Sequence, residues 1–141
     1  MKKKLLFLFL SALFILPATA QVTRLSNNTS YEWGFPLTNN LLILRSQLTN
    51  TLWVYNISGN NFTELSSTVT VQSDYDYGIM GGILYFAGKT VAEGIELWKT
   101  NGTPGGTTMV KDINAIGSAD SDPKYGFIEY NSALYFTAND G

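Results

Sequence analysis

The stretch that decides the fold is WGFPLTNNLLIL at residues 33–44, because the chain returns to this pattern twice. Residues 125–136 read YGFIEYNSALYF, 92 positions later and without a gap, and residues 77–86 read YGIMGGILYF between them. The Leu-Trp pair at 52–53 also returns at 97–98. A period of about 46 residues is typical of all-β arrays such as the blades of a β-propeller. The repeat therefore predicts an all-β fold built from successive similar units.

Each unit contains short segments rich in β-branched, aromatic and aliphatic residues, and turn residues separate them. Asn39-Asn40, Gly81-Gly82 and Asn131-Ser132 are predicted to be two-residue hairpin links, because small or Asn side chains tolerate positive φ. A second hairpin is predicted around residues 101–106. Two hairpins per unit amount to a four-stranded antiparallel sheet, the usual content of one propeller blade. The predicted strands are 41–45, 52–57, 68–72, 83–87, 96–100, 107–112, 127–130 and 133–137.

The segment 95–100 alternates most clearly. Ile95 and Leu97 would face one side of the sheet, and Glu96, Trp98 and Thr100 the other. Such alternation predicts a strand with one buried and one exposed face. A β-sandwich or a β-solenoid could also hold short strands, but neither fold requires the same residues at a fixed interval. The repeat favours propeller blades.

The N-terminus has the three parts of a secretory signal peptide. Lys2–Lys4 form a basic region, residues 5–16 an apolar region, and Ala18-Thr19-Ala20 a cleavage site. The apolar region is shorter than the ~20 residues that a helix needs to cross a bilayer. The sequence therefore predicts export to the extracellular space or the outer cell surface, with no transmembrane segment after cleavage.

Composition excludes several functional classes. The chain has nine Lys and Arg, 11 Asp and Glu, no His and no Cys. With the three leader lysines removed, six cations face 11 acids, a net charge of -5. A mildly acidic chain without a basic cluster is not expected to bind nucleic acid. Without His and Cys it lacks common metal ligands and the usual proton shuttle at neutral pH. The sequence predicts a non-enzymatic protein, and assigns no catalytic, cofactor-binding or metal residue.

Residues 96–113, ELWKTNGTPGGTTMVKDI, carry a recognisable motif. It resembles the ELW-x-[ST]-DGT-x-x-GT-x-x-VKDI repeat of secreted bacterial proteins, common in Bacteroidetes and sometimes labelled hyalin-like. Residues 133–141, ALYFTANDG, resemble the LYFTANDG stretch that precedes the next ELW copy. Asn101 stands where the family usually has Asp. The resemblance covers residues 77–141 well and 31–68 loosely. It implies a propeller-like protein that is secreted or surface-exposed, often with a C-terminal sorting domain, and it transfers no catalytic residue.

The repeat and the motif divide the chain into five parts: a signal peptide (1–20), a short lead (21–30), a degenerate first repeat that lacks the Asp-Gly-Thr tail (31–76), a second repeat (77–124) and a truncated third repeat (125–141). These two and a half units are fewer than the roughly four to eight blades that close a propeller. We expect a fragment that needs further C-terminal blades to close the ring. A short protomer that closes it by oligomerising is the alternative.

Acidic residues gather in the loop at residues 112–123. Asp112, Asn114, Asp120 and Asp122 offer oxygen ligands of the kind that Ca²⁺ prefers. No Glu closes an EF-hand loop here, and a solvated turn whose side chains cap backbone groups is the favoured interpretation.

A second acidic pair is Asp74 and Asp76. Paired carboxylates can hydrolyse glycosides if they face each other across a substrate. This pair precedes a strand at the start of a unit, so a polar turn between units is the favoured interpretation.

Aromatic residues recur at equivalent positions of each unit. Such rings can stack on sugars, but packing between sheets explains their recurrence more economically. Asn27, Asn56, Asn61 and Asn101 match the N-glycosylation pattern and are expected to be turn residues in a bacterial protein. The recurring aromatic residues are Trp33, Trp53, Trp98, Tyr85, Tyr125 and Tyr135.

Two functional classes remain open at this point. The first is a secreted or surface repeat protein that binds an extracellular protein or polysaccharide, or serves in adhesion or as a scaffold. The second is the N-terminal part of a secreted carbohydrate-active hydrolase or lyase with a propeller fold. One-off polar residues that converge on a central channel would favour the enzyme, whereas uniform loops would favour binding.

Overall fold

The computed structural model describes residues 30–72 and 77–141. The predicted signal peptide at 1–20, residues 21–29 of the lead, and the Asp74 and Asp76 pair lie outside the described residues. Within the described ranges the protein is all-β, and every strand pair is antiparallel. The predicted fold class is confirmed at this level. Among these residues no helix is long and apolar enough to span a membrane.

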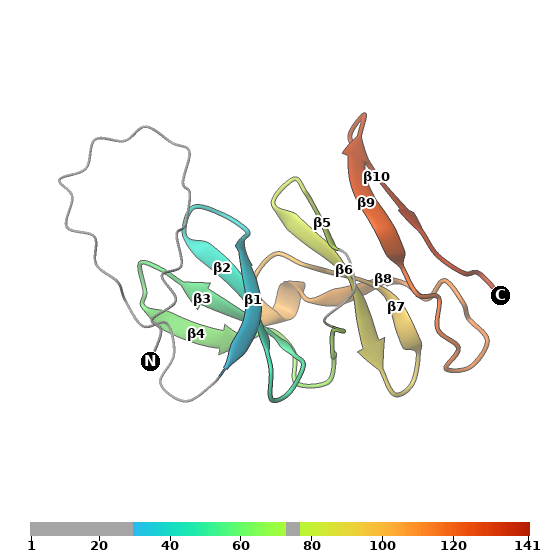
Figure 1. Cartoon of the computed structure of the whole chain (residues 1–141), viewed down its shortest axis with the longest axis horizontal. Coiled ribbons are helices and arrows are strands. Elements are labelled where there is room, and N and C mark those ends of the chain that lie inside the picture. The colour runs from blue at the N-terminus through green and yellow to red at the C-terminus, as the bar shows by residue number, and fades with distance from the viewer. Residues whose placement is uncertain (1–29, 73–76) are drawn as a thin grey trace, which may run out of the picture.

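The strands form three sheets that follow one another along the chain. In Figure 1 they run from the blue and green strands on the left to the red hairpin on the right. The first sheet has the order β1 (Tyr31–Pro36), β2 (Leu41–Ser46), β3 (Leu52–Asn56), β4 (Asn61–Glu64). The second has the order β5 (Tyr77–Met80), β6 (Ile83–Thr90), β7 (Gly94–Thr100), β8 (Thr108–Lys111). The third pairs β9 (Lys124–Tyr130) with β10 (Ala133–Thr137).

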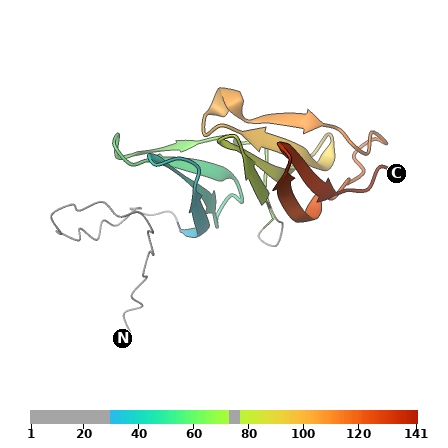
Figure 2. The same ribbon diagram turned by 90° about the horizontal axis from the view of Figure 1, so that it is seen from above.

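The main hydrophobic core lies between the first two sheets. Ile43 of β2 and Leu84 of β6 are both completely buried in it. The ring of Phe35 on β1 stacks on that of Tyr77 on β5, with centroids 4.1 Å apart. Figure 2 shows the two sheets side by side. The buried members of the core are Phe35, Leu37, Ile43, Leu52, Val54, Leu65, Val69, Val71, Leu84 and Phe86.

The third sheet packs closely on the other side of the second, where β5 contacts β9. Gly78 makes this approach possible. A Cβ atom built there would lie 2.8 Å from the Cβ of Phe127 and 2.9 Å from Cδ1 of Leu134. The missing side chain of Gly78 therefore lets β9 and β10 approach the second sheet.

Two of the three predicted hairpin links are confirmed. Gly81-Gly82 and Asn131-Ser132 are two-residue turns in which all four residues have positive φ, as type I′ geometry requires. The prediction for Asn39-Asn40 is wrong. The connection there is longer, because β1 ends at Pro36 and the backbone N–H of Leu37 donates to the Leu41 carbonyl at 2.9 Å.

The predicted strand at 68–72 is also wrong. This β-branched segment is the connection between the first two sheets, and it pairs only through isolated bridges of Thr70 to Thr51 and to Lys89. The sequence did not predict strands β1, β5 or the short β4. The turn between β3 and β4 carries Asn60 at a φ of 48°. High β-propensity at 69–71 reflects burial of Val69 and Val71 rather than membership of a sheet.

Strand β7 departs from the predicted pattern of one buried and one exposed face. Ile95 and Leu97 are buried on one face, and Glu96 and Thr100 are buried on the other. Glu96 is buried against the loop after β8, where it accepts from the Ile113 and Ser121 N–H groups, and the Thr100 hydroxyl is 2.8 Å from that of Thr107. Only Lys99 of this strand is exposed.

Candidate functional site

Each junction between sheets is closed by a backbone hydrogen bond of the same type. At the first junction, Lys89 donates its N–H to the carbonyl of Thr70 at 2.8 Å, and Thr70 donates back at 3.0 Å. At the second junction, Asn139 donates to the carbonyl of Ser121 at 2.7 Å. Lys89 and Asn139 occupy the same position after the Leu-Tyr-Phe motif of their units. Both linkers thus bind the sheet that follows them through an equivalent backbone hydrogen bond.

The linkers are also bound to the sheet that they leave. Val71 donates its N–H to the Asn50 carbonyl at 2.8 Å, and Ser121 donates to that of Ile95 at 2.9 Å. Arg45 strengthens the first linker. Its side chain is buried, and its Nε donates to the Val71 carbonyl at 2.6 Å. A charged donor on a buried carbonyl makes a comparatively strong hydrogen bond.

An open groove of about 390 Å³ lies beside the first junction. It is bounded by the linker, by the turn between β6 and β7, and by the loop that precedes β9. Four hydroxyl-bearing residues and one lysine line it, and the apolar member Val91 is 98% exposed. The lining residues are Thr68, Thr70, Lys89, Thr90, Val91, Gly94 and Ser118.

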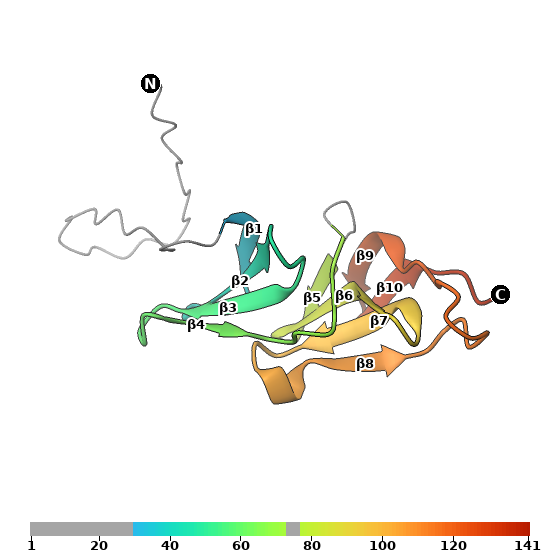
Figure 3. The ribbon, with the colours of Figure 1, turned by 90° about the horizontal axis from the view of Figure 1, so that it is seen from below.

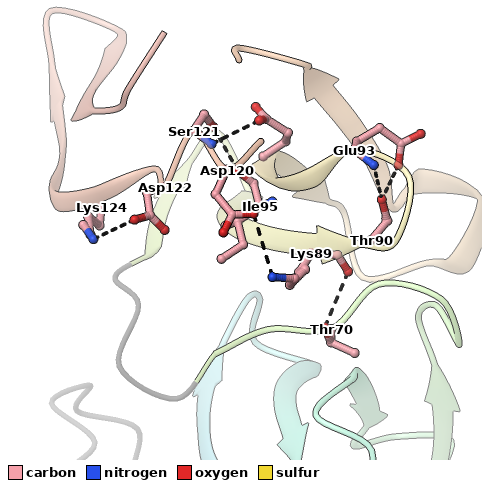
Figure 4. Close-up of polar contacts among 10 residues, drawn as sticks. Thr70, Lys89, Thr90, Glu93, Ile95, Asp120, Ser121, Asp122 and Lys124 are labelled. Atoms are coloured by element: carbon pink, nitrogen blue, oxygen red, sulfur yellow. Dashed lines mark hydrogen bonds and ion pairs between the residues drawn. The ribbon is translucent and has the colours of Figure 1, made fainter. Parts of the chain in front are cut away.

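Lys89 is the cation of this groove, and Figure 4 shows it between the linker and the loop that carries Asp120. Its Nζ lies 3.8 Å from Oδ1 of Asp120, and both side chains are more than a third exposed. Exposed ion pairs of this kind contribute about 0–1 kcal/mol. Because this attraction is weak, the Lys89 ammonium is able to exchange Asp120 for a ligand.

The turn between β6 and β7 is held in shape by its own side chains. Thr90 donates its hydroxyl to the Glu93 carboxylate, and the Glu93 N–H donates to Oγ1 of Thr90 at 3.1 Å. Gly94 follows at a φ of 77°, and a Cβ there would lie 2.6 Å from the Ser118 carbonyl oxygen. The turn and the Ser118 loop are therefore in close contact at one wall of the groove.

The side chains of the acidic loop at residues 112–123 do not come together as the cation-binding set that was the alternative to a solvated turn. Oδ1 of Asp120 accepts a hydrogen bond from the Ile95 N–H at 2.9 Å, and Asp122 forms an ion pair with Lys124 at 3.0 Å. Oδ1 atoms of Asp112 and Asn114 are buried without a hydrogen-bond partner. Over the ranges 30–72 and 77–141, no three His, Cys, Asp or Glu side chains come together as metal ligands.

The motif residues at 96–113 have structural roles. Glu96 is fully buried, and its carboxylate accepts from the Ile113 N–H at 2.7 Å and from the Ser121 N–H at 3.2 Å. Asn101 accepts from the backbone N–H of Thr103 at 3.1 Å and closes the turn. Gly102 packs on the first sheet, where an added Cβ would lie 3.1 Å from Cδ1 of Leu41. The motif thus specifies a unit and its contact with the preceding unit.

The aromatic set divides into packed and exposed members. Trp98 packs against the core, as predicted, and the half-buried Trp53 donates its indole N–H to Oγ1 of Thr51 at 3.2 Å. Tyr85 is half-buried, whereas Tyr135 is 56% exposed on the third sheet. The side chains of Trp33 and Tyr125 are not among those described. Of the N-glycosylation positions, Asn61 and Asn101 are exposed, Asn56 is half-buried, and Asn27 lies outside the described residues.

Sequence reasoning missed every residue that lines the groove. Lys89 and Thr90 end β6 and Ser118 lies in the loop before β9, where the repeat is weakest, and the segment of the first unit equivalent to the end of β6 has a different sequence. The one available signal was the position of Lys89 three residues after the Leu-Tyr-Phe motif.

Comparison with known proteins adds no relative. No family model matches the chain, and neither the curated proteins nor the solved structures contain a significant match.

Proposed function

We propose that the chain is a propeller-like part of a secreted or cell-surface repeat protein, and that it binds an extracellular polysaccharide in the groove at the junction of the first two sheets. The protein holds its ligand without chemical conversion. Further blades, in the same polypeptide or in an oligomer, complete the ring. The single observation that carries the binding role is the hydroxyl-lined groove around Lys89.

The propeller-like arrangement is supported by the order of strands within successive sheets. Both complete sheets follow the chain order from first to fourth strand, as the strands of a propeller blade do. In Figure 3, the first strands β1, β5 and β9 lie along one side of the row of sheets, and β4 and β8 along the other. The repeated junction bonds support the same arrangement, because an equivalent backbone hydrogen bond joins the second and the third sheet to the linker that precedes each of them.

The groove chemistry favours a sugar that carries a negative charge. The hydroxyl of Ser118 can donate and accept hydrogen bonds, as sugar hydroxyls require. The hydroxyls of Thr70 and Thr90 donate to the Lys89 carbonyl and to the Glu93 carboxylate, and each keeps an acceptor site for a sugar hydroxyl. The ammonium of Lys89 can pair with a carboxylate or sulfate group on the ligand. Exposed Val91 offers an apolar surface for the C–H face of a sugar ring. An acidic polysaccharide satisfies all three features.

The experiment is a glycan array with the whole chain, followed by calorimetry on any polysaccharide that binds. We expect binding to an acidic polysaccharide that weakens as salt rises, because the ion pair with Lys89 is screened. Lys89→Gln should lower the affinity by up to about fivefold, as expected for the loss of an exposed ion pair. Silence across neutral and acidic glycans would contradict the proposal.

The matched control is Lys111→Gln. Lys111 is an exposed lysine at the end of β8 and does not line the groove. Lys111→Gln therefore changes the net charge by the same amount as Lys89→Gln but leaves the groove intact. Equal losses from the two variants would indicate non-specific attraction and contradict a groove site. Asp120→Asn should change the affinity in the opposite direction to Lys89→Gln. The substitution keeps an oxygen for the Ile95 N–H but removes the negative charge that competes with the ligand for Lys89. We expect it to raise the affinity.

A further inference from the structure

We infer that one end of the sheets, the end with the β2–β3 and β6–β7 turns, inserts apolar side chains into the surface of a zwitterionic lipid bilayer. The inserting residues are Leu48 and Val91 at the tips of these two turns, together with Ile116 in the loop before β9. Val91 also borders the groove, but the membrane contact does not require a sugar there.

The three residues lie in connections at the same end of the sheets. In an antiparallel sheet whose strands follow chain order, the connection between the second and third strands and the connection that leaves the fourth strand lie at one end. Leu48 lies between β2 and β3, Val91 between β6 and β7, and Ile116 after β8. Figure 1 shows these connections along the lower side of the row of sheets. They are therefore able to meet one surface together.

These side chains protrude into solvent. Leu48 is 85% exposed, Val91 98% and Ile116 70%, the highest values among the large hydrophobic residues that the structure describes. A single exposed aliphatic residue is ordinary. Here both complete sheets carry one in the turn between their second and third strands, where Gly, Asn, Asp and Ser are the usual residues. The repetition indicates contact with an apolar partner.

The type of side chain favours a lipid surface over a protein. Protein-binding sites are centred on packed Trp, Tyr and Arg side chains, and Leu and Val are under-represented in them. The three exposed residues are all aliphatic, and they come from three separate connections. Leu, Ile and Val are favourable in the hydrocarbon of a membrane. A fluid bilayer also accommodates separate tips, because it has no fixed shape to match.

The polar groups of both turns are bonded within the protein. In the first turn, the N–H of Asn50 donates to the Ser46 carbonyl at 2.9 Å. In the second turn, the Thr90 hydroxyl donates to the Glu93 carboxylate and accepts from the Glu93 N–H. Polar groups that already have partners cost less to remove from water. The turns are therefore suited to entering the headgroup layer.

The charges at this end do not favour anionic lipids. Two exposed lysines, Lys89 and Lys111, lie here among the described residues, and Lys89 is paired with Asp120 at 3.8 Å. Attraction to anionic headgroups takes clusters of about four to eight Lys and Arg. Insertion of aliphatic side chains therefore supplies the affinity, and the matching lipid is zwitterionic.

The test uses the absence of Cys from the chain. An environment-sensitive dye is attached to Leu48→Cys, to Val91→Cys and, as the matched control, to Ile57→Cys. Ile57 is 47% exposed in the β3–β4 turn, at the opposite end of the first sheet. With phosphatidylcholine vesicles, the dye at positions 48 and 91 should brighten, shift to shorter wavelength and be quenched by brominated lipid. The dye at position 57 should keep its spectrum in water.

All three labelled chains share the apolar segment at residues 5–16, so differences between them report the turns alone. The response should persist as salt rises, which separates it from the salt-sensitive sugar binding proposed above. Unchanged spectra at positions 48 and 91 would overturn the inference. Equal changes at all three positions would also overturn it, because the chain would then bind without this orientation, and so would a response that requires anionic lipid.

Discussion

The backbone N–H of Asn139 donates a hydrogen bond to the carbonyl of Ser121 at 2.7 Å, and this bond fixes the third sheet to the linker that precedes it. The bond from Lys89 to Thr70, at 2.8 Å, does the same for the second sheet. Two junctions of different sequence thus share one backbone hydrogen bond, from the third residue after the Leu-Tyr-Phe motif to a carbonyl of the linker. Repetition in this chain extends from the strands within a sheet to the way in which one sheet is set against the next.

Glu96 is predicted to be the main polar support of the second junction. Its buried carboxylate accepts from the N–H groups of Ile113 and Ser121. Glu96→Ala leaves the Ile113 N–H without its acceptor, whereas the Ser121 N–H keeps the Ile95 carbonyl at 2.9 Å. Buried donors left unpaired cost about 1–3 kcal/mol each. We expect urea unfolding to show a loss of about 1–3 kcal/mol, with faster hydrogen exchange at the Ile113 amide.

Glu129→Ala serves as the control for Glu96→Ala. Glu129 is exposed on β9, and its loss should change stability by less than about 0.5 kcal/mol. Equal effects of the two substitutions would refute a buried, hydrogen-bonded role for Glu96.

Gly78 is predicted to hold the third sheet against the second. In Gly78→Ala, the new methyl group would lie 2.8 Å from the Cβ of Phe127, which is not the flexible end of a side chain. Overpacking of this kind costs about 1–3 kcal/mol. We expect faster hydrogen exchange in β9 and β10, with the first sheet unchanged. Gly105→Ala, where nothing lies within 4 Å of the added Cβ, should leave exchange unaltered.

Gly94 is predicted to be required for two reasons that can be separated. It has a φ of 77°, and an added Cβ would meet the Ser118 and Ala119 carbonyl oxygens at 2.6 and 2.9 Å. Gly81 has a φ of 59° with open space around it. Gly81→Ala should therefore cost only the conformational strain, about 1 kcal/mol. Gly94→Ala should lower the melting temperature further, and a similar melting temperature for both variants would exclude the steric contribution.

The strands were predictable wherever a hydrophobic repeat coincided with a turn signal. β6 and β10 follow Gly81-Gly82 and Asn131-Ser132, and both were located within a few residues. The prediction of a strand around Thr70 is wrong because alternating buried valines give the same sequence pattern in a strand and in a buried linker. Propensity records burial and says little about pairing partners.

The candidate site could not be predicted in the same way. Thr70 lies in the linker between the first two sheets, Thr90 ends β6 and Ser118 lies in the loop before β9, so their proximity depends on the tertiary packing of these segments. Asp120 and Asp122 were candidate Ca²⁺ ligands because acidic residues close in sequence can supply oxygen ligands to one cation. In the fold these two side chains bind different partners, Ile95 and Lys124.

Asn101 is predicted to be replaceable by Asp but not by Ala. Its Oδ1 accepts from the N–H and from the hydroxyl of Thr103, at 3.1 and 2.7 Å. Asp supplies the same oxygen, so Asn101→Asp should leave the unfolding midpoint within error. Asn101→Ala removes the acceptor and should cost about 1 kcal/mol in urea unfolding. An Ala variant as stable as the Asp variant would show that the turn does not depend on this side chain.

The most direct test of the repeated architecture is hydrogen exchange measured by NMR at the backbone amides of Lys89 and Asn139 in the whole chain. If successive sheets are joined by one device, both amides should exchange slowly, and the Val91 amide in the neighbouring exposed turn should exchange fast. Slow exchange at Lys89 with unprotected exchange at Asn139 would contradict the account, because the third sheet would then not be joined as the second is.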